Sequence, residues 1–194
     1  MKVVEIFTSI QGEGKFLGTP VIFIRLAGCN LNCGFCDTDW SKGQNMTIAE
    51  IKSVLDMQKG IKRVVITGGE PTIHKGFEEL CMNLKSWGYK VNIETNGTTA
   101  ANHKYIDWIT CSPKEDADYM CDCASDEIKL VVTPTFDIND PRLRHFWESG
   151  LDIWLQPEGS QMKEMWNKCA YLAINNPSKN LRVGVQLHKL MEVR

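Results

Sequence analysis

Short runs of β-branched and aliphatic residues alternate with amphipathic segments along most of this chain. Strand-like runs stand at residues 21–27, 62–67, 90–95, 106–110, 127–133, 151–156 and 180–187, and helical patterns stand near 47–58, 74–88, 139–149 and 160–175. Strands that alternate with helices are typical of βαβ units, whose strands run parallel. The pattern therefore predicts an α/β fold with a mainly parallel sheet.

The helix expected over residues 47–58 has the clearest local signals. Ile48, Ile51 and Leu55 recur on one helical face. Thr47 and Glu50 have the spacing of a capping box, in which each side chain accepts a hydrogen bond from the backbone N–H of the other residue. The helix is expected to begin just after Thr47.

The chain has 194 residues, of which 43% are hydrophobic and 24% charged. This length suits one core, and no internal repeat or long linker divides it, so residues 1–194 are expected to form a single domain. A complete eight-stranded (β/α) barrel needs about 250 residues. We therefore expect a partial, open (β/α) barrel.

Charge and hydropathy exclude several classes of partner. The net charge is −2, which gives no basic footprint for nucleic acid and favours a small-molecule substrate. The longest apolar stretch, at 21–27, is interrupted by Arg25 and falls far short of the roughly 20 residues that span a bilayer. Glu5 interrupts any apolar core of a signal peptide. We expect a cytoplasmic protein that contacts neither nucleic acid nor membrane.

Three cysteines follow the apolar run at 21–27. Cys29, Cys33 and Cys36 are separated by three and then two residues. A structural zinc site wants four ligands, usually as two close pairs, whereas three clustered thiolates can hold a [4Fe–4S] cube with one iron open. The triplet therefore predicts a cluster whose open iron binds a small molecule.

The remaining cysteines are left outside the predicted site. A zinc knot completed by Cys121, Cys123 or His188 is the alternative for the triplet, and an auxiliary metal is the alternative for Cys121 and Cys123. Cys81 and Cys169 lie in helical patterns and are expected in the core. Eight cysteines would indicate disulfides in a secreted chain, but a group of three metal ligands fits a reducing compartment better.

A second motif, Val64-Val-Ile-Thr67-Gly68-Gly69-Glu70-Pro71, reads as a strand that runs into a glycine turn. In isolation it could be only a tight strand exit, although adjacent glycines let the backbone approach a ligand. Together with the cysteine triplet it resembles the radical S-adenosylmethionine (SAM) superfamily. In that superfamily SAM chelates the open iron, the glycine turn binds the SAM amino group, and a 5′-deoxyadenosyl radical abstracts hydrogen from the substrate.

Further motifs narrow the resemblance. They are Ser9-Ile10-Gln11-Gly12-Glu13-Gly14, Cys36-Asp37-Thr38, Glu94-Thr-Asn-Gly97, Ser112-Pro-Lys114, Gln156-Pro157 and Gln186-Leu-His188-Lys189. As an ordered, nearly full-length set they resemble the 7-carboxy-7-deazaguanine synthase family. The resemblance implies conversion of 6-carboxy-5,6,7,8-tetrahydropterin to 7-carboxy-7-deazaguanine with loss of ammonia, toward queuosine-type 7-deazapurines. It also implies a partial barrel, a homodimer and an electron donor such as flavodoxin or ferredoxin.

The resemblance assigns the substrate site to Ile10, Gln11, Gly12, Glu13, Arg25, Thr67, His188 and the carboxylate of Arg194. Arg25 interrupts an apolar strand, so its guanidinium needs a partner, either the substrate carboxylate or an internal salt bridge. A strand histidine such as His188 is more often structural. Arg194 departs from the terminal proline that is common in the family.

Cofactor contacts are implied in the same way. SAM is expected near Phe35, Cys36, Asp37, Gly69, Glu94, Ser112, Pro113, Lys114, Gln156 and Glu158, and Thr38 is expected to offer its hydroxyl to Mg²⁺. The alternatives are a turn cap at Asp37-Thr38 and solvated loop residues elsewhere. The stretch 40–46 is shorter than in many members of the family. The rival functions are another radical SAM enzyme, such as a glycyl-radical activase, and a non-enzymatic zinc-binding module.

Overall fold

The computed structural model describes residues 1–58, 60–159 and 162–194. In these ranges one sheet has the strand order β3-β1-β2-β4-β5-β6-β7-β8-β9. The strands are β1 (Lys2–Ile10), β2 (Pro20–Leu26), β3 (Gln44–Asn45), β4 (Arg63–Gly68), β5 (Lys90–Thr95), β6 (Trp108–Cys111), β7 (Glu127–Val132), β8 (Asp152–Pro157) and β9 (Leu181–Val183). Neighbours from β2 to β9 pair in parallel, whereas β1 pairs antiparallel with β2 and with β3. The predicted, mainly parallel sheet is confirmed.

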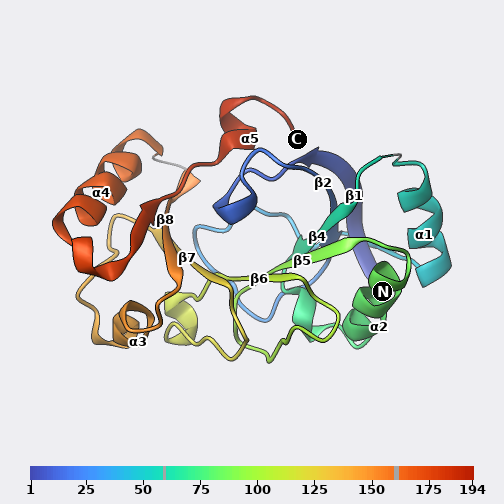
Figure 1. The fold of residues 1–194 in the computed structure, drawn as a ribbon, viewed down its shortest axis with the longest axis horizontal. Coiled ribbons are helices and arrows are strands. Elements are labelled where there is room, and N and C mark those ends of the chain that lie inside the picture. The colour runs from blue at the N-terminus through green and yellow to red at the C-terminus, as the bar shows by residue number, and fades with distance from the viewer. Residues whose placement is uncertain (59, 160–161) are drawn as a thin grey trace.

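The helices lie on the outside of the curved sheet (Figure 1). They are α1 (Ile48–Asp56), α2 (Phe77–Ser86), α3 (Arg144–Trp147), α4 (Met162–Asn175) and α5 (Leu187–Leu190). One pair, α1 and α2, covers one half of the sheet, and α3 and α4 cover the other half (Figure 1). Because β3 and β9 are the two edges, the sheet does not close. The prediction of a partial, open (β/α) barrel is therefore confirmed.

The core explains why the parallel strands are continuous apolar runs. Val64, Val65 and Ile66 in β4 have no exposed surface, as expected for a strand whose two faces are both covered. One hydrophobic cluster packs β2, β4 and β5 against α1 and α2, and a second packs β7 and β8 against α3 and α4. Both clusters hold the strands so that their carboxyl ends meet at one edge.

The helix predicted near Thr47 begins as expected. Thr47 Oγ1 accepts from the backbone N–H of Glu50 at 3.2 Å, and the Glu50 carboxylate accepts from the backbone N–H of Thr47 at 2.7 Å. Ile51 and Leu55 are buried, so the apolar face also packs as predicted. The capping box and the helix are both confirmed.

Several elements differ from the sequence prediction. The pattern missed β1 and β3, because β1 mixes apolar and polar side chains and β3 has only two residues, both exposed. The helix expected over 139–149 is reduced to α3 after a 3-10 turn at Pro141–Leu143. The run at 180–187 is a strand only over Leu181–Val183. The prediction that His188 lies in a strand is wrong, since it belongs to α5.

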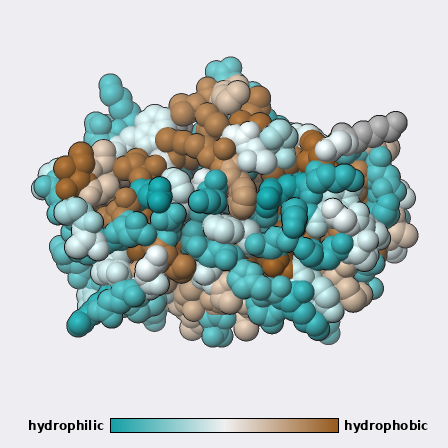
Figure 2. All heavy atoms as spheres, in the orientation of Figure 1, coloured by the Kyte–Doolittle hydropathy of each residue, from teal (hydrophilic) through white to brown (hydrophobic). Residues whose placement is uncertain are grey.

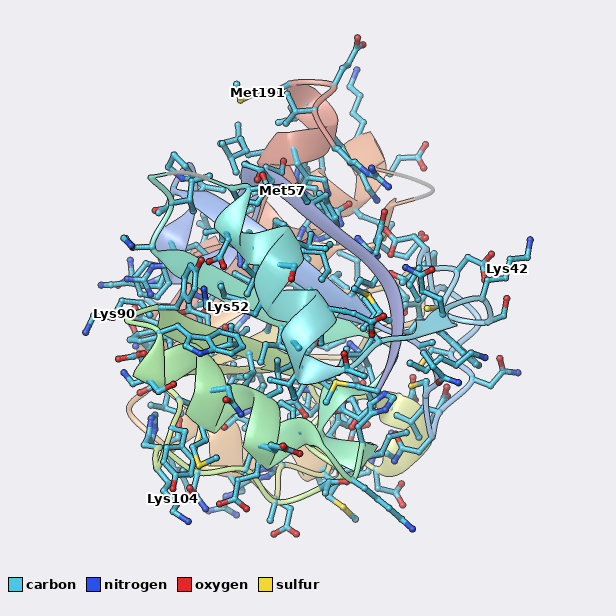
Figure 3. All side chains as sticks on the ribbon, turned by 90° about the vertical axis from the view of Figure 1, so that its right-hand side faces the viewer. Lys42, Lys52, Met57, Lys90, Lys104 and Met191 are labelled. Carbon is cyan, nitrogen blue, oxygen red and sulfur yellow. The ribbon has the colours of Figure 1, made fainter. Side chains whose placement is uncertain are left out.

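The face shown in Figure 2 is mostly polar, with a group of apolar residues around α5 at the top of the view. Lys42, Lys90 and Lys104 project outward in the view that faces α1 and α2 (Figure 3). Residues 160–161 of the expected last helix lie outside the described residues. No helix within the described ranges is long and apolar enough to cross a membrane.

Candidate active site

A cavity of about 390 Å³ lies at the carboxyl ends of the parallel strands and along the concave face of the sheet. Such a volume is in the usual range of roughly 300–1,000 Å³ for small-molecule sites. Of the residues predicted for the site, all but Gly12 and Pro113 line it: Ile10, Gln11, Glu13, Arg25, Cys29, Cys33, Phe35, Cys36, Asp37, Thr38, Thr67, Gly69, Glu94, Ser112, Lys114, Gln156, Glu158, His188 and Arg194. Motifs far apart in the sequence thus surround one space.

The cysteine triplet lies in the loop that follows β2. The loop is closed at its base by the Gly28 backbone N–H, which donates to the Trp40 carbonyl at 3.0 Å. Within it, Cys36 N–H donates to the Cys33 carbonyl at 3.1 Å, and Cys29 Sγ accepts from the Leu31 N–H at 3.4 Å. The three thiols are free and face the same cavity. This arrangement fits three thiolates that would hold a [4Fe–4S] cluster beside the cavity.

The glycine turn after β4 packs directly on the cysteine loop. A Cβ on Gly69 would stand 1.8 Å from the Gly28 carbonyl oxygen, and one on Gly68 would stand 2.1 Å from the Leu26 carbonyl oxygen. Gly68 also has a φ of +136°, which other residues rarely adopt. Close packing therefore requires both glycines, whatever ligand the turn also binds.

Glu70 fixes this turn to the end of β5. Its buried carboxylate accepts from the Thr95 hydroxyl at 2.7 Å and from the Asn96 backbone N–H at 2.6 Å. Asn96 lines the cavity and donates to Asn30 Oδ1 at 3.0 Å in the cysteine loop. The β4 turn, the β5 end and the cysteine loop are thereby held as one unit.

A buried ammonium joins two carboxylates on the floor of the cavity. Lys129 Nζ lies 2.6 Å from Glu13 Oε2 and 3.0 Å from Glu94 Oε2. Burial disfavours the ammonium, but the two carboxylates outweigh burial and hold the pKa of Lys129 above its usual value. Burial opposes ionisation of Glu94 as well, yet the Lys129 charge keeps the pKa of that carboxyl below its usual value. Lys129 and Glu94 are therefore both charged near neutral pH.

Two amides complete this network. Gln11 Nε2 donates to Glu94 Oε1 at 3.0 Å, and Gln186 Nε2 donates to Glu13 Oε1 at 2.9 Å. The polar side chains of the N-terminal loop are therefore held in place before any ligand arrives. Ordered donors and acceptors of this kind can read the edge of a heterocycle.

Lys114 is a second lysine of the cavity lining. Its Nζ donates to Ser112 Oγ at 2.6 Å. Burial, followed by repulsion from Lys129, lowers the pKa of Lys114. An anionic group bound in the cavity would offset both effects, which suits this lysine to a carboxylate or another anion.

Arg25 has partners on both sides. Its Nε lies 3.0 Å from Glu5 Oε1 as an ion pair without hydrogen-bond geometry, and its Nη1 donates to Thr38 Oγ1 at 3.2 Å. Glu5 also pairs with the guanidinium of Arg194. The internal salt bridge considered from the sequence is thus present, and the same guanidinium also faces the cavity.

The C-terminal segment reaches across to the N-terminal loop. His188 lies against Gly12, where a Cβ would stand 1.8 Å from His188 Nδ1, and Leu187 N–H donates to the Gly12 carbonyl at 3.0 Å. Gly12 therefore supports the wall without lining it. Burial lowers the pKa of His188, which keeps its imidazole neutral near pH 7. The backbone carbonyl of Arg194 accepts from the Ser9 hydroxyl.

Comparison with known proteins identifies the family. The model of the radical SAM superfamily matches residues 23–152. The chain is 37% identical over 196 residues to the 7-carboxy-7-deazaguanine synthase of Bacteroides thetaiotaomicron, covering 100% of this chain and 98% of the relative. The protein belongs to the 7-carboxy-7-deazaguanine synthase family.

Other members of this family and the solved structures agree. The synthase of Aquifex aeolicus is 35% identical, with 98% of this chain and 93% of the relative covered. The crystal structure of QueE from Escherichia coli matches with a TM-score of 0.77 and 30% identity, over 96% of this chain and 94% of that chain. Streptococcus suis SuiB bound to S-adenosylmethionine, at 17% identity and a TM-score of 0.55, shares the fold alone; 83% of this chain and 51% of that chain are covered.

These findings confirm the predicted fold, family and enzyme class, and they do not favour the zinc-module and activase alternatives. A radical SAM enzyme uses a [4Fe–4S] cluster and SAM, acts on a small molecule in this family, and needs a reductant. The residues present fit these groups. Three free thiols face the cavity, and neither polar atom of the buried Gln156 amide, which also lines the cavity, has a hydrogen-bond partner among the residues that the structure describes. An adenosyl group would supply such partners.

Several polar residues at the site were not predicted, among them Lys129, Glu70, Asn96 and Gln186. Lys129 stands in the apolar run Glu127–Val132, the same signal that identified Arg25. Glu70 and Gln186 belong to recognised motifs but were given no role. Pro113 is buried beside Ser112 and does not line the cavity.

Proposed function

We propose that this protein converts 6-carboxy-5,6,7,8-tetrahydropterin to 7-carboxy-7-deazaguanine with loss of ammonia, in the formation of queuosine-type 7-deazapurines. The observation that carries the proposal is the shared cavity. Gln11 and Glu13 from the N-terminal loop face the same space as the Cys29, Cys33 and Cys36 loop. A small polar heterocycle bound by the first loop would therefore lie beside the cluster and SAM.

The chain positions the reactive groups, and the cofactors carry the chemistry. When bound, the [4Fe–4S] cluster and SAM supply radical chemistry that begins with one-electron reduction of the SAM sulfonium. Cys29, Cys33 and Cys36 hold the cluster. The backbone at Gly69 would bind the SAM amino group, and Glu94 and Gln156, which line the same cavity, would bind its adenosyl group.

Substrate recognition follows from the polar network. Gln11 and Glu13 are preordered through Glu94 and Lys129, so they present fixed acceptors and donors to the pterin edge. The Nε of Arg25 lies beside Glu5, so its Nη groups would donate hydrogen bonds to the substrate carboxylate. The remaining substrate contacts that we propose are Ile10, Thr67, His188 and Arg194.

We further propose that Mg²⁺ binds at Thr38. Its hydroxyl accepts from Arg25 Nη1 at 3.2 Å, which leaves an oxygen lone pair directed away from the guanidinium. A hard cation takes such oxygens together with waters and substrate oxygens. The support is that Thr38 lines the cavity beside Arg25, where the substrate carboxylate is proposed to lie.

The partners follow from the exposed parts of the site. A flavodoxin or ferredoxin is proposed as the reductant, because Cys36 is exposed and offers a short electron path to the cluster. A homodimer is proposed, with the apolar group around α5 in Figure 2 as the candidate contact. At the end of α5 and just after it, Leu190, Met191 and Val193 are 53%, 56% and 42% exposed. A cytoplasmic location is proposed because eight free cysteines suit a reducing compartment.

An anaerobic assay tests the proposed activity. Reconstituted protein is incubated with the carboxytetrahydropterin, SAM and dithionite, and 7-carboxy-7-deazaguanine and ammonia are quantified. Both products should form in equal amounts and should be lost in Cys33→Ala. SAM cleavage without either product, at full iron content, would overturn the proposed substrate.

A further inference from the structure

Three cysteines that lie outside the cavity converge on one point. Cys111 ends β6, and Cys121 and Cys123 lie in the segment that leads to β7. The three Sγ atoms all lie within 4.8 Å of one another, and those of Cys121 and Cys123 are 3.9 Å apart. No disulfide joins them. Only the fold brings Cys111, ten residues earlier in the sequence, to the Cys-Asp-Cys pair.

The backbone around these thiols is fixed. Asp122 N–H donates to the Gly97 carbonyl at 2.7 Å, and Ala124 N–H donates to the Ala101 carbonyl at 3.0 Å. Gly97 has a φ of +80°, and a Cβ there would stand 2.5 Å from Cys111 Sγ. The segment that follows β5 therefore supports the Cys-Asp-Cys pair and leaves room at the sulfur of Cys111.

We propose that Cys111, Cys121 and Cys123 bind a single thiophilic divalent cation, in the first place Zn²⁺. Zinc–sulfur bonds of about 2.3 Å in a tetrahedron place the sulfur atoms about 3.8 Å apart, close to the 3.9 Å between Cys121 and Cys123. The fourth ligand is Ser125 Oγ or a water. Ser125 Oγ lies 3.1 Å from Cys121 Sγ and 3.5 Å from Cys123 Sγ, at the spacing of neighbouring ligands.

The surroundings indicate a structural ion. Cys111 is fully buried and the other two cysteines are half-buried, so the cation would be largely enclosed, as in structural zinc sites. None of the three lines the cavity of the active site. A second [4Fe–4S] cluster fits less well, because each thiolate would have to reach a different iron, whereas these sulfurs converge on one point.

The position of the proposed ion beside the active-site wall indicates a structural function. The segment it would fasten to the end of β6 carries Ser112 and Lys114, which line the active site. Binding would pin both ends of residues 111–123 and so restrict the wall that holds these side chains. The ion would therefore stabilise the fold and the position of Lys114 without taking part in the reaction.

Metal analysis is the first test. Protein without an affinity tag is purified anaerobically from zinc-supplemented cells, and its metals are measured by mass spectrometry. We expect about one zinc per chain beside the roughly four irons of the cluster. Cys121→Ala and Cys123→Ala should each lose the zinc and keep the iron. The matched control is Cys169→Ala, a buried cysteine in α4 that should keep both. Iron without zinc in the wild type, or equal zinc loss in the control, would overturn the proposal.

Cobalt gives a second readout that does not depend on these variants. A chain with Cys29, Cys33 and Cys36 all changed to Ala has no cluster colour, so Co²⁺ added to it can be followed by its visible spectrum. We expect the intense bands of tetrahedral thiolate-bound Co²⁺ at one equivalent, bleached by Zn²⁺. A pale octahedral spectrum, or a disulfide among the three cysteines in anaerobic peptide maps, would refute the site.

Discussion

Arg25 and Lys129 are cations in otherwise apolar strands, and both have carboxylate partners. A single cation in an apolar strand can therefore be paired in two different ways. Lys129 is fully occupied by Glu13 and Glu94, whereas the single carboxylate beside Arg25 is shared with Arg194. A strand sequence can reveal that a buried cation needs an anion. It cannot reveal whether the protein itself supplies enough of them, because the partners come from distant segments.

Arg25→Lys tests whether this guanidinium also binds the substrate carboxylate. Lysine keeps the charge but loses the planar fork, so substrate binding should weaken by about 1–3 kcal/mol. SAM binding should change little. The KM for the pterin and the equilibrium binding of SAM are the measurements, with Arg63→Lys, remote from the cavity lining, as the control. An unchanged KM together with a lower free energy of unfolding would make Arg25 purely a partner of Glu5.

Thr38→Ala tests the proposed Mg²⁺ ligand. We expect Mg²⁺ to stimulate turnover of the wild type and to stimulate the variant less, because one positioning oxygen is lost. Iron content should stay unchanged. Thr38→Ser keeps the hydroxyl and should retain most of the effect. Turnover is measured across a Mg²⁺ titration, and the same metal dependence in all three proteins would leave Thr38 as the acceptor for Arg25 alone.

Helices with strong local signals were predictable, and short elements were not. The limits of α1 follow from its own capping box and apolar face. In contrast, α3 and α5 have four residues each and depend on tertiary contacts, such as the hydrogen bond from Leu187 to Gly12. Because such contacts are invisible in a linear pattern, His188 was assigned to a strand. Its place at the cavity was still predicted, since the family motif carries it there.

Thr47→Ala tests the capping box of α1. Removing the hydroxyl leaves the Glu50 N–H without its side-chain acceptor, so the free energy of unfolding should fall by about 1 kcal/mol. Anaerobic urea unfolding gives the value. Ser53→Ala changes an exposed hydroxyl in the same helix and should stay within about 0.5 kcal/mol of the wild type. Equal values for the two variants would show that the cap contributes no stability.

On the scale of the whole molecule, the open parallel sheet explains why sequence motifs predicted one shared site. Most of the motifs lie at or just after the carboxyl ends of parallel strands, which share one edge of the sheet. The Ser9–Gly14 motif is the exception, because it follows the antiparallel β1 and reaches the cavity from the other edge. The closure of the site was not predictable, because it depends on C-terminal contacts such as that of Lys189 with Asp37 at 2.6 Å. Lys129 likewise joins the N-terminal loop to β5 and β7 through Glu13 and Glu94. Loss of the Lys129 ammonium should therefore lower the free energy of unfolding of the whole protein.

Lys129→Met should lower the free energy of unfolding at pH 8 by about 3 kcal/mol, because two carboxylates would remain buried without their cation. The contribution of Lys129, whose folded pKa is raised, is fully present below its unfolded value of about 10.5 and is lost only at higher pH. The contribution of Glu94, whose folded pKa is lowered, is present above its unfolded value of 4.5 and is lost as the pH falls through the folded one.

The deficit of Lys129→Met should consequently shrink as the pH falls from 8 to 4, since Glu94, buried without its cation in the variant, takes up a proton in this range. Anaerobic urea unfolding across this range provides the curve. Lys90→Met is the matched control, because Lys90 is exposed, with an ion-pair distance of 3.5 Å to Asp107, and should cost little at any pH. A deficit that stays constant with pH would mean that Lys129 acts through the packing of its side chain, with no electrostatic link between the three segments.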